Sequence, residues 1–81
     1  MIVKYLNNIY FINNHLIKGT GEGRSILLTK NNSDYIMLEF RDTKTRDFVL
    51  SQIWAELVNK TETFDIDKLV EVLENKTKYN V

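Results

Sequence analysis

Residues Asp42–Asn59 read DTKTRDFVLSQIWAELVN, and this segment carries the clearest structural signal in the chain. Its apolar residues recur at helical spacing, and they are Val49, Leu50, Ile53, Trp54, Leu57 and Val58. The polar residues from Asp42 onward can supply an N-cap, and Asn59 suits a helix end. On a helical wheel the six apolar residues cover about half the circumference, which is wider than the ~100° stripe of a helix that packs on one side only. We therefore predict a helix that is covered on two sides.

A second helix is predicted after a short polar break. Asp65 can cap its start, and Phe64 can pack against Leu69 as a hydrophobic staple. Its apolar stripe is narrower than that of the first helix and consists of Ile66, Leu69, Val70 and Leu73. We expect this second helix to close over the first.

The residues that precede Asp42 are typical of short antiparallel strands. Asn-Asn pairs and the segment Gly19–Gly23 separate runs of β-branched and aromatic residues, and Asn and Gly favour turns. The expected strands are Ile2–Leu6, Ile9–Ile12, His15–Lys18, Ser25–Lys30 and Tyr35–Arg41, of which the second and third could fuse if Asn13-Asn14 is a bulge. The sequence therefore predicts one α+β domain over residues 1–81. An antiparallel β-meander of three to five strands occupies residues 1–41, and an αα-hairpin packed on the sheet occupies residues 42–81.

Composition excludes several kinds of site. The 81 residues include eleven Lys and Arg, eleven Asp and Glu, no Cys and the single histidine His15. A net charge of zero disfavours a protein that mainly covers phosphate backbone, and the absence of Cys excludes disulfides and thiolate sites. No apolar run approaches the ~20 residues that span a bilayer. We expect a non-enzymatic, cytoplasmic protein that uses no metal and no cofactor.

The Gly-rich segment is the most distinctive local feature. Glycines allow backbone N–H groups to converge on an anion, and cations flank the segment. The candidate binding residues are Lys18, Gly19, Gly21, Gly23 and Arg24. The spacing fits neither a P-loop nor a dinucleotide fingerprint, and no helix is expected after the last glycine. A hairpin tip is therefore the preferred interpretation, with a nucleotide or small-anion sensor as an alternative.

A second alternative uses the aromatic residues of the strand half. Tyr5, Tyr10, Phe11, Tyr35 and Phe40 alternate with Lys4, Lys18, Lys30 and Arg41, a pattern that suits single-stranded nucleic acid. Strands are rich in aromatics for packing reasons alone, and no RNP1-like run is present. We expect aromatics that pack inward and weak binding to nucleic acid.

The preferred function is protein binding, as an inhibitor or adaptor. The chain has more apolar strand and helix surface than 81 residues easily cover, so a partner protein or a second copy is expected to cover the rest. The candidate interface residues are Phe48, Trp54 and Val58, and a homodimer is expected. Lys outnumbers Arg by eight to three, which is typical of AT-rich coding and suggests an accessory protein of a phage or mobile element that acts on a host protein.

Overall fold

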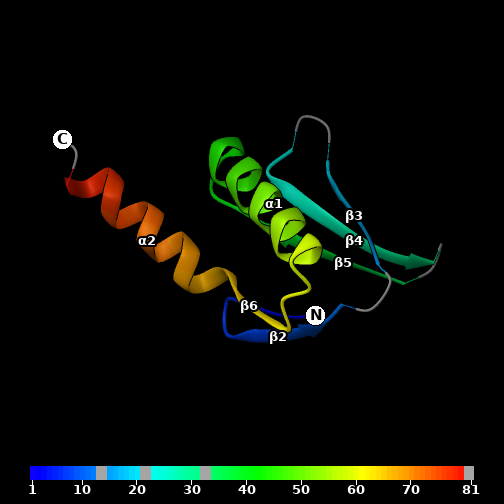
Figure 1. Ribbon diagram of the computed structural model, residues 1–81. Helices are drawn as coiled ribbons and strands as arrows, with labels where there is room; N and C mark the ends of the chain where they lie inside the picture. Colours follow the sequence, from blue (N-terminus) through cyan, green and yellow to red (C-terminus); the bar gives the residue numbers. More distant parts are fainter. Residues whose placement is uncertain (13–14, 21–22, 32–33, 80–81) are drawn as a thin grey trace.

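The computed structural model describes residues 1–12, 15–20, 23–31 and 34–79 (Figure 1). This part of the chain forms six strands and two helices. In chain order they are β1 (Ile2–Tyr5), β2 (Asn8–Phe11), β3 (Leu16–Gly19), β4 (Ser25–Asn31), β5 (Asp34–Glu39), α1 (Thr43–Val58), β6 (Thr63–Asp65) and α2 (Ile66–Tyr79). The α+β class, with strands first and helices after them, is confirmed. The short strand β6 between the helices was not predicted.

The strands form two three-stranded sheets. The first has the order β2-β1-β6, in which β1 pairs antiparallel with β2 and parallel with β6. The second is the antiparallel meander β3-β4-β5. The predicted break between the second and third strands falls at Asn13-Asn14, which lies outside the described residues.

The β1–β2 hairpin turns one residue earlier than the Asn-Asn pair suggested. Leu6 and Asn7 have φ values of 51° and 62°, and Tyr5 pairs with Asn8 across the turn. Two consecutive residues with positive φ are the requirement of a type I′ hairpin turn, which matches the twist of the strands. Leu6 therefore belongs to the turn and not to the predicted strand.

Both predicted signals at the ends of α1 are confirmed. The Asp42 carboxylate accepts a hydrogen bond from the Thr45 backbone N–H at 2.7 Å, which makes Asp42 the N-cap. Hydrogen bonds from the Thr45 side chain and from this backbone N–H, together with the nearby Arg41 guanidinium, lower the pKa of Asp42 below its usual value. Asn59 is the C-cap, and Lys60 follows it with a φ of 56°.

The residues after α1 close a Schellman motif. The Lys60 N–H donates to the Leu57 carbonyl at 3.1 Å, and the Thr61 N–H donates to the Glu56 carbonyl at 3.0 Å. This motif places its left-handed residue directly after the C-cap, a position that usually carries Gly. Here Lys60 adopts the left-handed conformation despite its Cβ.

The core lies between the two sheets and α1. Figure 1 shows α1 against one face of β3-β4-β5. The buried apolar side chains form one cluster, which comprises Val3, Tyr5, Ile12, Ile26, Leu28, Leu38, Phe40, Val49, Leu50, Ile53 and Ile66. Stacked rings of Tyr5 and Phe40, with centroids 4.8 Å apart, join the two sheets. The Tyr5 hydroxyl donates to the Glu39 carbonyl at 2.6 Å, and burial is the main cause of the raised pKa of this phenol.

Helix α2 begins where the sequence predicted, but it does not lie over the outer side of α1. Asp65 caps it by accepting from the Lys68 N–H at 3.0 Å. In Figure 1, α2 extends away from the sheets at an angle to α1 and does not lie over it. Trp54 and Val58 are 49% and 81% exposed, so the expectation that the second helix closes over the first is wrong. Within the described residues, one side of α1 has no cover.

Candidate functional site

The base of the Gly-rich segment is held by an arginine that the sequence did not single out. Arg46 extends from α1, is only 5% exposed, and donates from Nη1 to the carbonyls of Thr20 and Ser25, both at 2.9 Å. Its Nε donates to the carboxylate of Asp47 at 2.8 Å. A buried guanidinium needs hydrogen bonds to be stable, and these three contacts satisfy Nη1 and Nε. Arg46 thereby ties the segment to α1.

Gly19 is a glycine because of this arginine. A Cβ at position 19 would lie 2.7 Å from Nη1 of Arg46 and 3.3 Å from a methyl group of Leu50. Neither Gly19 nor Gly23 has a positive φ, so backbone conformation does not require glycine at either position. At position 19, the close approach of the Arg46 guanidinium is what requires glycine. Gly21 lies outside the described residues.

The two flanking cations lie in different surroundings. Lys18 is adjacent to Gly19 on β3, so its side chain projects from the opposite face of the sheet. Arg24 donates to the Arg41 carbonyl at 3.2 Å. The Thr20 N–H donates to the Ser25 carbonyl and the Gly23 N–H donates to the Thr20 carbonyl, at 3.1 Å each. These described groups do not converge on a common point, and the binding role of the segment stays a prediction.

The aromatic residues of the strand half are divided between interior and surface. Tyr5 and Phe40 are buried in the core, whereas Phe11 and Tyr35 are exposed. The two exposed rings lie on different sheets, because Phe11 belongs to β2 and Tyr35 to β5. The expectation that these aromatics pack inward therefore holds for some of them only.

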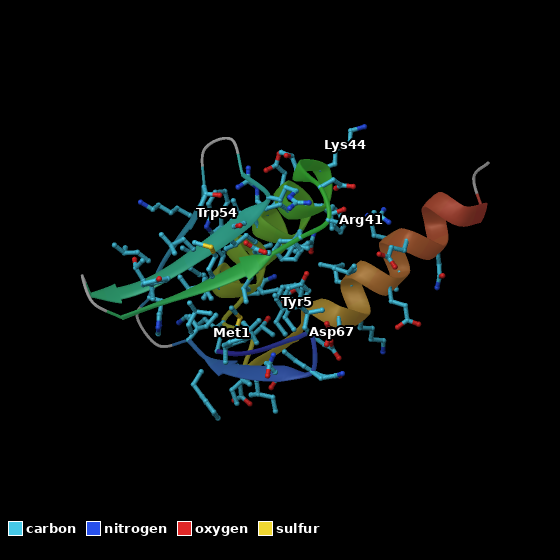
Figure 2. All side chains as sticks on the ribbon, turned by 180° about the vertical axis from the view of Figure 1, so that it is seen from behind. Met1, Tyr5, Arg41, Lys44, Trp54 and Asp67 are labelled. Carbon is cyan, nitrogen blue, oxygen red and sulfur yellow. The ribbon has the colours of Figure 1, made fainter. Side chains whose placement is uncertain are left out.

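Asp67 has a structural partner that the sequence did not suggest. Its two carboxylate oxygens accept from the backbone N–H groups of Leu6, at 2.6 Å, and Asn7, at 3.2 Å. Figure 2 shows Asp67 near Tyr5, where α2 meets β1. Because the N–H groups of a turn with positive φ point to one side, one carboxylate can accept from both. Asp67 thus attaches the start of α2 to the β1–β2 hairpin.

The predicted interface residues Phe48, Trp54 and Val58 all lie on one side of α1. At 100° per residue, this side is nearly opposite the buried residues Val49 and Ile53. We call it the outer face of α1, and it comprises Lys44, Asp47, Phe48, Ser51, Trp54, Ala55 and Val58, all of which are exposed. Apolar residues thus occupy two opposite sides of one 16-residue helix.

One end of the outer face borders a groove between α1 and α2. The groove has a volume of about 440 Å³, and its lining residues are Arg41, Asp42, Lys44, Thr45, Phe48 and Leu73. Phe48 and Leu73 provide its apolar surface, Lys44 adds positive charge at its border, and Arg41 forms an ion pair there with Asp42 at 3.3 Å. Figure 2 shows Lys44 at the start of α1 and Arg41 between this end of the helix and α2. Arg41 also pairs with the Glu74 carboxylate at 3.5 Å.

Other chemistry has little support in the described residues. Among residues 1–12, 15–20, 23–31 and 34–79, no group of His, Asp and Glu is arranged to hold a metal ion. No helix in this part of the chain is long and apolar enough to cross a membrane. The chain matches no family model, no curated protein and no solved structure. The outer face of α1 and the adjoining groove are therefore the candidate site.

Proposed function

We propose that this chain is a non-enzymatic protein-binding domain, an inhibitor or adaptor, that docks its partner on the outer face of α1. One observation carries the proposal: α1 buries one apolar side and exposes another that includes Phe48, Trp54 and Val58. A helix that serves only the core needs one apolar side, and its other side is normally polar. Covering the second side with a partner gains about 25 cal/mol for each Å² of apolar surface removed from water.

The groove supports a partner of defined chemistry. Phe48 and Leu73 suit an apolar side chain that enters between the helices. Lys44 at the border suits a carboxylate on the same partner segment. We therefore expect the partner to present an apolar residue with an acidic residue beside it.

A photo-crosslinking experiment tests the proposed function. Trp54 is replaced by benzoylphenylalanine, an aromatic of similar size, in the organism that encodes the chain. Irradiation is expected to yield one specific protein adduct, which Val58→Asp removes. Leu16→Asp is the matched control, because Leu16 is also an exposed apolar residue, at 75%, but lies on β3. The proposal is wrong if no adduct forms, or if the adduct survives Val58→Asp.

The finer aspects of the proposal rest on the sequence. An accessory protein of a phage or mobile element, acting on a host protein in the cytoplasm, fits the preference for Lys over Arg that AT-rich coding produces. Single-stranded nucleic acid as the ligand is less well supported, because Lys4 pairs with Asp65 at 3.8 Å and the exposed rings Phe11 and Tyr35 lie on separate sheets. Weak retardation of DNA or RNA in gels at physiological salt is the expected result.

A further inference from the structure

We infer that the partner on the outer face of α1 is a second copy of this chain, bound with its α1 antiparallel. This inference rests on the proposed function and names a second copy as the occupant of the same surface, for which a host protein would compete. It follows from the order of side chains along the helix, from the positions of the groove and of Val58, and from the charges at the two ends.

Four of the seven residues of the outer face have a symmetric order along the helix, with Trp54 to one side of them. Phe48, Ser51, Ala55 and Val58 follow one another at intervals of three, four and three residues, with a large residue at each end and two small residues between them. In an antiparallel pair, Phe48 therefore meets the second copy's Val58, and Ser51 meets the second copy's Ala55. Small residues at the centre let two helices approach closely, and a 3-4-3 spacing keeps one seam in contact.

The two ends of the outer face are complementary in shape. Val58, at 81%, is the most exposed of the large apolar side chains that the structure describes. The groove beside Phe48 lies at the other end of the same helix, ten residues or about 15 Å away. A two-fold interface requires each surface to fit itself, so that residue i contacts j and j contacts i. In an antiparallel pair, the Val58 of each copy lies at the groove of the other copy, so both contacts form together.

The charges at the two ends favour the same orientation. Antiparallel pairing about residue 53 brings the start of one α1, with Lys44 and Asp47, to the segment that follows the second copy's α1, which carries Lys60 and Glu62. All four residues are exposed. Parallel pairing would instead place like charges together, which is unfavourable. Helix α1 is about 24 Å long, so the contact is small, and we expect a dissociation constant in the micromolar range.

Whether the chain forms a dimer is tested by sedimentation equilibrium of the purified full chain at micromolar concentrations. The expected mass rises with concentration toward twice the 9.6 kDa of one chain. Val58→Asp should raise the dissociation constant at least about tenfold, because the dimer would bury an unpaired carboxylate. Leu16→Asp should leave the constant unchanged. Reversing one charge, in Lys44→Glu or Glu62→Lys, should weaken the dimer several-fold, and the two reversals together should restore it.

The orientation is tested with cysteine variants, since the chain has no cysteine of its own. Lys44→Cys and Asn59→Cys chains are prepared separately, mixed, and treated with a short bis-maleimide. Positions 44 and 59 lie about 22 Å apart along one helix. An antiparallel pair therefore links position 44 of one chain to position 59 of the other, whereas each variant alone remains unlinked. Linkage of either variant to itself in preference would overturn the antiparallel arrangement.

Failure of this inference can be distinguished from failure of the proposed function. A strictly monomeric mass at all concentrations, or a dimer that tolerates Val58→Asp, overturns the second copy as the partner. The photo-adduct formed at position 54 then decides whether the proposed docking function stands. An adduct with a different protein, lost in Val58→Asp, leaves the docking function standing, and the absence of any adduct overturns both.

Discussion

Replacing Gly19 by Ala should destabilise the protein, because Arg46 already occupies the space of the added methyl group. The new Cβ would lie 2.7 Å from Nη1, so the guanidinium must move and lose at least one of its two carbonyl hydrogen bonds. Such a bond to a charged group contributes about 1.5–3 kcal/mol, and overpacking costs about 1–3 kcal/mol. Alanine offsets about 0.5–1 kcal/mol of this cost, because it reduces the conformational entropy of the unfolded chain. The net loss is about 1.5–5.5 kcal/mol, which lowers the melting temperature by at least about 6 °C.

A double-mutant cycle isolates this cause. Urea unfolding followed by circular dichroism gives the free energy of unfolding for Gly19→Ala, Arg46→Ala and the double variant. Once Arg46 is shortened, Gly19→Ala should cost almost nothing. Gly23→Ala is the control: its Cβ would meet the Thr20 hydroxyl, whose neutral hydrogen bond to the Ser25 carbonyl at 3.3 Å contributes about 0.5–1.5 kcal/mol, so its cost should stay below that of Gly19→Ala. An equal cost of Gly19→Ala in both backgrounds would show that Arg46 is not the cause of the destabilisation.

Three further changes have defined outcomes. Lys60→Gly should stabilise the protein by about 1 kcal/mol, since it removes the Cβ penalty at a φ of 56°, and thermal denaturation measures this gain. Asp42→Ala should lower stability at neutral pH but not in strong acid, because the pKa of Asp42 is lowered in the folded state. The contribution of its carboxylate to stability is present above the unfolded pKa and is lost as the pH falls through the folded pKa. Equal urea midpoint differences at both pH values would contradict this. Lys18→Ala with Arg24→Ala should leave the dimerisation constant unchanged, and common nucleotides should not shift the melting temperature of the parent chain; a nucleotide shift that the double variant abolishes would establish the anion sensor instead.

Local sequence signals predicted most of the elements. Both helix starts were found because Asp42 and Asp65 are N-caps, and a cap depends only on residues within one turn. The meander β3-β4-β5 was found because turn residues separate β-branched runs. Strand β6 was missed because it has only three residues and exists through parallel pairing with β1, a partner about 60 residues away.

The candidate site was predicted only in part, because it too depends on contacts between residues that are far apart in the sequence. Phe48, Trp54 and Val58 could be named from the width of the apolar pattern, but whether α2 covers them depends on where β6 directs α2. Arg46 was missed because nothing in its neighbourhood distinguishes a buried arginine from an exposed one on a polar helix surface. Its contacts with Thr20 and Ser25 are contacts across more than twenty residues, which no local pattern reveals.

Trp54 reports on the proposed interface, because it is the only tryptophan in the chain and lies half-exposed on the outer face of α1. Its fluorescence emission is recorded over a dilution series that spans the micromolar range. We predict a blue shift as concentration rises and the second copy covers the indole, and no such shift in the Val58→Asp variant. Emission that stays at the wavelength of a half-exposed indole at every concentration would contradict the claim that a second copy binds this face.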